Sequence, residues 1–319
     1  MADDVVVALD VGGTGIKCAL VDPTGRVRHS ERHPTGRERG PDAVVATILD
    51  IADGLVRTAD RMGLRATATG IVVPGVIDEA SGVAVWSANV GFREVPLKAL
   101  VADRTGLPAA LGHDVRAGGL AEARLGAGRA FRHVLAVLIG TGIAAAHVVD
   151  GKVFAGAHGA AGELGHIVVR SDGPACGCGL RGCLEAIASA SAVARRYAER
   201  VTDGGSAGAD RVAALAAAGD PVAAAIWQET VDALADGLLT GLALFDPEVV
   251  VVGGGLAEAG DTLLAPLGAA LRARITFHRE PALFRAALGD EAGCLGAGLI
   301  AQDALAGPTA QDALDRESR

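Results

Sequence analysis

Residues 9–17 read LDVGGTGIK, and this stretch is the first indication of the fold. It continues the apolar run VVVAL, which predicts a buried strand over 5–11. After the glycines the sequence IKCALVD alternates, so that Ile16, Cys18 and Leu20 share one face of a second strand. The glycine-rich loop therefore joins two strands of a hairpin, and its small residues allow backbone amides to approach an anion such as phosphate.

Two common phosphate loops do not fit this stretch. Rossmann and Walker loops both run from a strand into a helix, whose amino terminus faces the phosphate. Here the third Rossmann glycine would fall at Cys18, and no Lys-Ser or Lys-Thr pair closes a Walker motif. The sequence therefore predicts a phosphate loop of a different kind.

Composition limits the class of protein. The chain has 319 residues, of which 50% are hydrophobic and 21% charged, enough for one large or two medium domains. Its net charge of −9 argues against a nucleic-acid partner. No segment approaches the roughly 20 apolar residues of a membrane span, and the first residues lack a basic leader. We therefore expect a cytoplasmic protein without membrane contact.

The order of strand, small-residue loop and second strand occurs twice, at 5–22 and at 133–149. This weak repeat predicts two α/β halves, and two such loops facing each other would hold a polyphosphate between domains. Apolar spacing also predicts helices, at 41–62, 96–105, from Asp114 onward, 184–201, 221–245 and 293–306.

A zinc site is the strongest local prediction. One imidazole and three thiols lie within eighteen residues, on His166, Cys176, Cys178 and Cys183, with glycines between them. Four such ligands form a closed tetrahedral set, which is typical of structural zinc. The CxC and Cx4C spacings argue against a redox CxxC pair.

The runs DVGGTGIK, GAHGAAGELGH and CGCGLRGCLE together resemble the ROK family of repressors and sugar kinases. The resemblance implies an α/β, actin-like (ribonuclease H-like) two-domain sugar kinase fold with its active site in the interdomain cleft. It implies a small domain over 1–116, completed by a C-terminal helix at 297–312, and a large domain over 117–296. The implied reaction is ATP-dependent phosphorylation of a hexose, with glucose and its 6-hydroxyl as the first expectation, Mg²⁺ as cofactor and zinc as a structural ion.

The resemblance also assigns nucleotide-binding residues. These are Asp10, Gly12, Gly13, Thr14 and Lys17 at the first phosphate loop, Gly140, Thr141 and Gly142 at the second, and Gly253, Gly254 and Gly255 near the adenosine. Mg²⁺ would bridge the phosphates, with Asp10 near its water shell. For Gly253–Gly255, a plain turn from a strand into a helix remains the alternative.

A sugar hydroxyl that attacks the γ-phosphate must lose its proton, and a carboxylate at a strand end suits this role. Asp114 stands between a predicted strand and a helix, a position that an N-cap alone would also explain. The resemblance makes it the catalytic base. It also nominates sugar-binding residues, namely Asn89, His113, Glu163, His166 and Glu185. Glu185 has the alternative role of starting the following helix.

Two positions depart from the family pattern. His113 stands where family kinases usually carry Asn, and Ala144–Ala146 replace glycines. N-acetylhexosamine, fructose-like and cyclitol kinases therefore remain alternatives, as does a sugar-binding member without catalysis. A repressor of the family would need a helix-turn-helix segment ahead of the strand that begins at residue 5. We expect sugar and ATP as small-molecule partners, and a homodimer or homotetramer.

Overall fold

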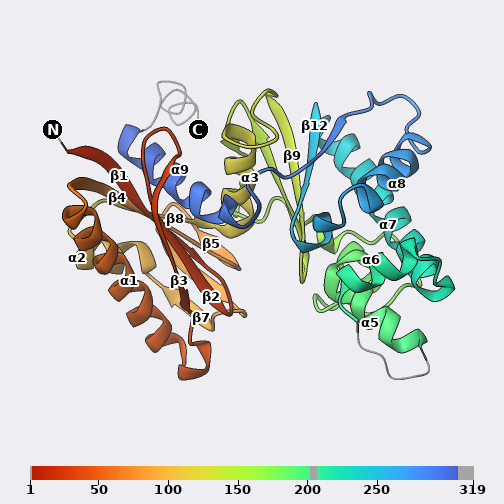
Figure 1. Ribbon diagram of the computed structural model, residues 1–319, viewed down its shortest axis with the longest axis horizontal. Helices are drawn as coiled ribbons and strands as arrows, with labels where there is room; N and C mark the ends of the chain where they lie inside the picture. Colours follow the sequence, from red (N-terminus) through yellow and green to blue (C-terminus); the bar gives the residue numbers. More distant parts are fainter. Residues whose placement is uncertain (1, 202–206, 308–319) are drawn as a thin grey trace. The chain divides into compact units, whose positions relative to one another are not determined.

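The computed structural model describes residues 2–201 and 207–307. They form two compact units (Figure 1). Among the described residues, the first unit comprises 2–121, 155–160 and 290–307, and the second comprises 122–154, 161–201 and 207–289. The division into domains at 116–117 stays a prediction.

The first unit is built on a five-stranded sheet in the order β3-β2-β1-β4-β8. Strands β1 (Asp3–Val11), β2 (Gly15–Val21) and β3 (Val27–Pro34) are antiparallel neighbours. Strands β4 (Leu64–Val73) and β8 (Ala109–His113) continue the sheet in parallel with β1. The glycine-rich loop thus lies in a β-hairpin, as the sequence predicts.

Two helices cover this sheet. Helix α1 (Pro41–Arg61) packs its apolar side, including Val44 and Ile48, against Val7 and Leu9 of β1. Helix α9 (Ala292–Ala306) packs on β1, β4 and β8, although it is far from them in sequence (Figure 1). Gly70 of β4 allows this approach, because a Cβ there would collide with the Ala297 carbonyl of α9. The helix expected at 297–312 corresponds to α9, and residues 308–312 lie outside the described part.

Smaller elements surround the sheet of the first unit. Strands β5 (Val76–Asp78), β6 (Val83–Ser87) and β7 (Phe92–Val95) form a three-stranded sheet. The short helix η1 (Arg37–Arg39) precedes α1, α2 (Leu97–Thr105) follows β7, and η4 (Gly289–Glu291) precedes α9. Helix α3 (Asp114–Arg124) begins directly after β8.

The second unit repeats the same sheet pattern. Its order is β11-β10-β9-β12-β13, from β11 (Lys152–Val153), β10 (Ile143–Val149), β9 (His133–Ile139), β12 (Val249–Gly253) and β13 (Ala282–Arg285). The first three are antiparallel neighbours, whereas β12 and β13 continue in parallel with β9. Because both sheets place a hairpin loop between their first two strands in chain order, the predicted internal repeat is confirmed.

Helices complete the second unit. The longest is α7 (Pro221–Phe245), whose apolar residues share one core with β9 and β12. Helices α6 (Ala209–Ala217) and α8 (Asp261–Arg272) pack on α7, and η2 (Leu164–His166) and η3 (Gly255–Ala259) are short turns.

One sequence-based element was wrong. The helix predicted over 184–201 is two helices, α4 (Leu184–Ala188) and α5 (Ala190–Arg200), separated at Ser189. The Ser189 hydroxyl accepts a hydrogen bond from the Ala192 amide at 3.1 Å. This N-cap starts a new helix in a sequence whose apolar spacing alone is continuous.

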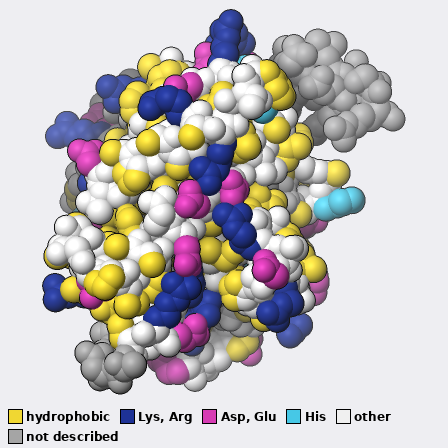
Figure 2. Space-filling view, turned by 90° about the vertical axis from the view of Figure 1, so that its right-hand side faces the viewer, with side chains coloured by type: hydrophobic (Ala, Val, Ile, Leu, Met, Phe, Trp, Pro, Cys, Tyr) yellow, Lys and Arg dark blue, Asp and Glu magenta, His cyan; other side chains and the backbone are white. Residues whose placement is uncertain are grey.

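On the face drawn in Figure 2, basic and acidic side chains are interspersed among the coloured residues, without a broad basic region. Within 2–201 and 207–307, no helix is both long and apolar enough to cross a membrane.

Candidate active site

The first phosphate loop is held closed by backbone and side-chain hydrogen bonds. The Gly12 amide donates to the Gly15 carbonyl at 2.9 Å, and the Thr35 hydroxyl donates to the Gly12 carbonyl at 2.6 Å. Thr35 is fully buried. A Cβ on Gly13 would lie 3.3 Å from the Asn89 carbonyl. The loop is therefore fixed in shape and lies beside Asn89, one of the predicted sugar-binding residues.

A buried carboxylate lies at the base of this loop. Asp10 is the last residue but one of β1 and lies directly opposite Lys17 of β2, and the start of α9 packs against it so closely that a side chain on Gly293 would collide. Burial raises the pKa of Asp10 to about 6, the positive charge of Lys17 opposes this, and Asp114 and Asp290 add to it. The charged carboxylate of Asp10 is therefore higher in free energy, relative to its protonated form, than a carboxylate in water, and such a shift is typical of functional sites.

Lys17 is held by an acid that the sequence reading did not single out. Its ammonium group donates to Asp290 Oδ1 at 3.1 Å, and Asp290 also accepts from Arg32 at 3.1 Å. Hydrogen bonding and the charge of Lys17 hold the pKa of Asp290 below its usual range. Lys17 is thus the register partner of Asp10 in the sheet, and its ammonium group pairs with Asp290.

Asp114 is the first residue of α3, and His113 is the last of β8. The Asp114 Oδ1 atom accepts from the Val115 amide at 2.7 Å and lies 3.3 Å from His113 Nδ1. The Arg116 amide donates to the same His113 nitrogen at 3.4 Å. The carboxylate is therefore oriented at the helix start, and the imidazole of His113 lies directly beside it.

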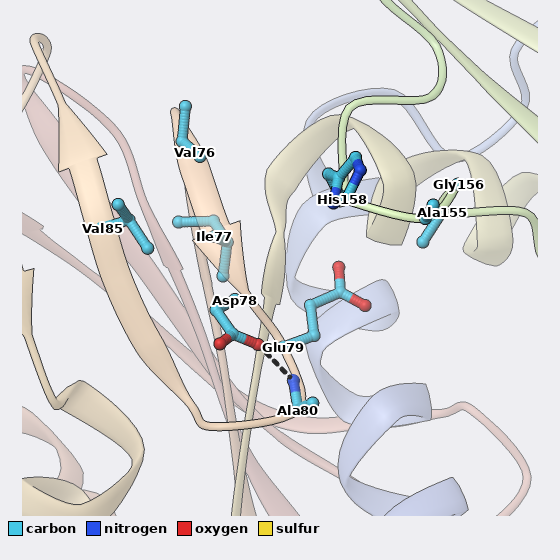
Figure 3. Close-up of a pocket in the computed structure, with 11 residues that line it drawn as sticks. Val76, Ile77, Asp78, Glu79, Ala80, Val85, Ala155, Gly156 and His158 are labelled. Atoms are coloured by element: carbon cyan, nitrogen blue, oxygen red, sulfur yellow. Dashed lines mark hydrogen bonds between the residues drawn. The ribbon is translucent and has the colours of Figure 1, made fainter.

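Arg116 was missed by the sequence analysis. It is 3% exposed, and its guanidinium group donates to Glu79 at 2.8 Å and to the Gly159 carbonyl at 2.7 Å. These contacts join α3, the end of β5 and the segment 155–160. Figure 3 shows the hollow between the last two, in which the Glu79 carboxylate points toward the segment that carries His158.

The second phosphate loop is organised differently. The Gly140 amide donates to the Gly142 carbonyl at 2.9 Å, and the Gly140 carbonyl accepts from the Ala190 amide at 2.9 Å. The Ile143 amide donates to Glu185 Oε2 at 2.9 Å. Glu185, half-buried on α4, therefore fixes the start of β10. The alternative role expected for it, starting the next helix, is also met, because it lies in the first turn of α4.

Gly253–Gly255 form a turn that leads from β12 into η3. Gly254 has a φ of 80°, and a Cβ there would lie 2.5 Å from the Ile139 carbonyl. Only glycine fits this close approach. The turn therefore lies beside the end of β9, directly before Gly140, so the structure brings together two of the three predicted nucleotide-binding segments.

Backbone packing explains the glycines of GELGH. The Ala145 amide donates to the Gly162 carbonyl at 2.7 Å, and Cβ atoms on Gly162 or Gly165 would collide with carbonyls of β10. The backbone of β10 at Ile143 and Ala145 therefore lies against this loop, which comes so close because it has glycine at both positions. This packing positions Glu163 and His166 at the two ends of a single 3₁₀ turn.

The four predicted zinc ligands lie together. Their ligand atoms are all within 4.8 Å of one another. Cys178 Sγ is 3.6 Å from Cys183 Sγ, and Cys176 Sγ is 3.7 Å from His166 Nδ1. Zn–S bonds of about 2.3 Å in a tetrahedron place two sulfurs roughly 3.8 Å apart, so the donor set fits zinc. The other imidazole nitrogen, His166 Nε2, faces Glu163 at 3.8 Å.

These features define a class of protein. Two sheets of the same strand order, each with a small-residue hairpin loop, are the actin-like fold, and the Cys/His cluster follows the second hairpin. The ROK family model matches residues 6–304, and the chain belongs to the ROK family.

Individual relatives agree with this assignment. The chain is 34% identical to the glucokinase of Thermotoga maritima, over 95% of this chain and 98% of that protein. It is 34% identical to the N-acetylmannosamine kinase of Citrobacter koseri, over 92% and 98%. The structure of a ROK family glucokinase from Streptomyces griseus, in complex with glucose and AMPPNP, is similar with a TM-score of 0.78 and 31% identity, over 93% of this chain and 99% of that one.

Proposed function

We propose that the chain is an ATP-dependent hexose kinase that transfers phosphate to the 6-hydroxyl of glucose. The observation that carries this proposal is the carboxylate of Asp114 at the start of α3, in the same unit as a glycine-rich phosphate loop with a buried acid at its base. The similarity to glucokinases over nearly the whole chain supports it.

In this proposal Asp114 accepts the proton of the attacking hydroxyl, which is general-base catalysis late in phosphoryl transfer. Its hydrogen bond from the Val115 amide and its contact with His113 orient the carboxylate. Mg²⁺, when bound with ATP, would neutralise charge on the phosphates. Asp10 is the residue proposed to lie near the water shell of this Mg²⁺. Burial raises the pKa of Asp10, but the positive charge of Lys17 lowers it and so favours the negatively charged carboxylate that a cation attracts.

The remaining residues fall into two groups. Those proposed for the nucleotide are Gly12, Gly13, Thr14, Lys17, Gly140, Thr141, Gly142, Gly253, Gly254 and Gly255. Those proposed for the sugar are Asn89, His113, Glu163, His166 and Glu185. Zinc held by His166, Cys176, Cys178 and Cys183 would fix the orientation of His166 and, through it, Glu163. We also propose a cytoplasmic homodimer or homotetramer.

The substrate is tested by ADP release measured with a panel of sugars, namely glucose, mannose, fructose and N-acetylmannosamine. We expect the highest kcat/KM with glucose. Release that depends on N-acetylmannosamine alone would instead support the second candidate, which the similarity to N-acetylmannosamine kinases favours. No sugar-dependent release in the folded protein would leave a sugar binder without catalysis.

His113 sharpens the same assay. If its imidazole bonds a sugar hydroxyl beside Asp114, His113→Asn changes the donor and acceptor geometry at that hydroxyl. We expect the ratio of kcat/KM values between two sugars to shift by about tenfold, the scale of one buried polar contact. An unchanged ranking of sugars would remove His113 from the sugar site.

A further inference from the structure

A second group of metal-binding side chains lies in the first unit, on the edge strand β3. His29, Glu31 and His33 alternate along the strand and therefore share one face. Cys18 of β2 lies directly opposite Glu31 in the antiparallel register. One thiol, one carboxylate and two imidazoles are thus placed on one side of the β2–β3 hairpin, and none of them belongs to the Cys/His cluster of the second unit.

The side chains are already gathered around one carboxylate. Glu31 Oε1 lies 2.7 Å from His29 Nε2, and Glu31 Oε2 lies 2.9 Å from His33 Nε2. The ligand atoms of Cys18, Glu31 and His33 are all within 4.8 Å of one another. Donors of a tetrahedral ion lie roughly 3.3 to 3.8 Å apart, so small side-chain rotations would bring these three atoms onto one centre.

The surroundings suit an exchangeable ion. Cys18 is buried, whereas the side chains of Glu31 and His33 are about one-third exposed, so the group has a buried side and a side open to solvent.

The chemistry of the donors selects the class of metal. Mg²⁺ and Ca²⁺ prefer sites made of oxygen ligands alone, whereas thiolate and imidazole favour zinc and its neighbours among the divalent transition metals. We propose that Cys18, Glu31 and His33 bind one Zn²⁺ or similar ion, with His29 positioning the Glu31 carboxylate. The bound ion would cross-link β3 to β2, and β2 is also the second strand of the hairpin that carries the first phosphate loop.

The test counts metal and does not depend on kinase activity. Protein stripped with a chelator is titrated with Zn²⁺, and bound zinc is measured after gel filtration. We expect His33→Gln to bind one equivalent fewer than the wild type, and His278→Gln, which lies in the second unit, to bind the wild-type amount. Equal zinc content in all three proteins would overturn the proposal.

Co²⁺ provides an independent readout. A thiolate ligand gives a charge-transfer band in the near ultraviolet, so we expect Cys18→Ser to lower that band by the share of one thiolate. A band of wild-type intensity in Cys18→Ser would contradict the site. Should His33→Gln fail to fold, Glu31→Gln carries the same zinc count, with the same expected loss of one equivalent.

Discussion

The two loops proposed to bind phosphate lie at corresponding positions of the two sheets, between β1 and β2 and between β9 and β10, but different side chains surround them. The loop between β1 and β2 has Asp10, Lys17 and Asp290 at its base, and burial raises the pKa of Asp10 to about 6. The loop between β9 and β10 is held by neutral backbone bonds and by Glu185, which accepts from the Ile143 amide. Hydrogen bonds thus fix both loops, and the first loop in addition has three charged side chains at its base.

The two units therefore share a sheet topology but not the charged side chains around the loop. In the first unit, burial raises the pKa of the Asp10 carboxylate, which is typical of functional sites. In the second unit, glycines and a cluster of thiols fix the loop positions. We infer that the first unit contributes the reactive charges and the second contributes a rigid frame for the ligands.

The largest expected effect concerns this frame. Cys178→Ser removes one ligand from the Cys/His cluster, and we expect it to lower bound zinc by one equivalent and to reduce the melting temperature and glucose affinity together, because metal binding contributes directly to folding of the loop. Cys294→Ala, at a buried cysteine outside the cluster, is the control. Unchanged zinc content in Cys178→Ser would disprove the ligand set.

The next effect concerns the reactive charges. Asp114→Asn retains the shape of the side chain and an oxygen that can accept from the Val115 amide, but it cannot take a proton. We expect kcat to fall by at least about two orders of magnitude, the usual scale for losing a general base, with glucose affinity within a few-fold of the wild type. Turnover close to that of the wild type would assign the base to another residue.

Local sequence patterns predicted much of the fold and of the site. The alternation after the glycines predicted the β1–β2 hairpin, and the spacing of His166 and the three cysteines predicted a cluster that the structure brings within ligand distance. Contacts between distant segments could not be predicted in this way. Lys17 pairs with Asp290, and Arg116 binds Glu79 and Gly159, because the fold brings these segments together. The break between α4 and α5 at Ser189 was not predicted, because the apolar spacing is continuous across it and does not reveal the N-cap that starts the second helix.

Arg116 gives a smaller effect, on positioning rather than on chemistry. Arg116→Met retains much of the bulk but loses the bonds to Glu79 and to the Gly159 carbonyl, so the segment before Glu163 loses an anchor. We expect KM for glucose to rise about tenfold, about 1.4 kcal/mol, with kcat changed less than twofold. Arg116→Lys should recover part of the loss, and Arg129→Met, at an exposed arginine, should have no effect. A lower melting temperature with unchanged KM would reduce Arg116 to a structural role.

The acid at the first loop also makes the free energy of unfolding depend on pH. The pKa of Asp10 is about 6 in the folded chain, above its ordinary value of 3.8. The folded state therefore binds this proton more tightly than the unfolded state, and stability falls as pH rises from about 4 to about 6. Above pH 6 the full penalty of the buried charge is present, and below pH 4 it is absent.

The melting temperatures of two variants, one at each loop, test whether the acid at the first loop lowers stability while the acid at the second loop raises it. At pH 8, Asp10→Asn removes the buried charge, and we expect it to raise the melting temperature by several degrees while abolishing most of the kinase activity. Glu185→Ala removes the acceptor of the Ile143 amide, and we expect a lower melting temperature. The gain in Asp10→Asn should shrink as pH is lowered toward 4. A lower melting temperature for both variants at pH 8 would contradict the claim that the charge of Asp10 destabilises the first loop.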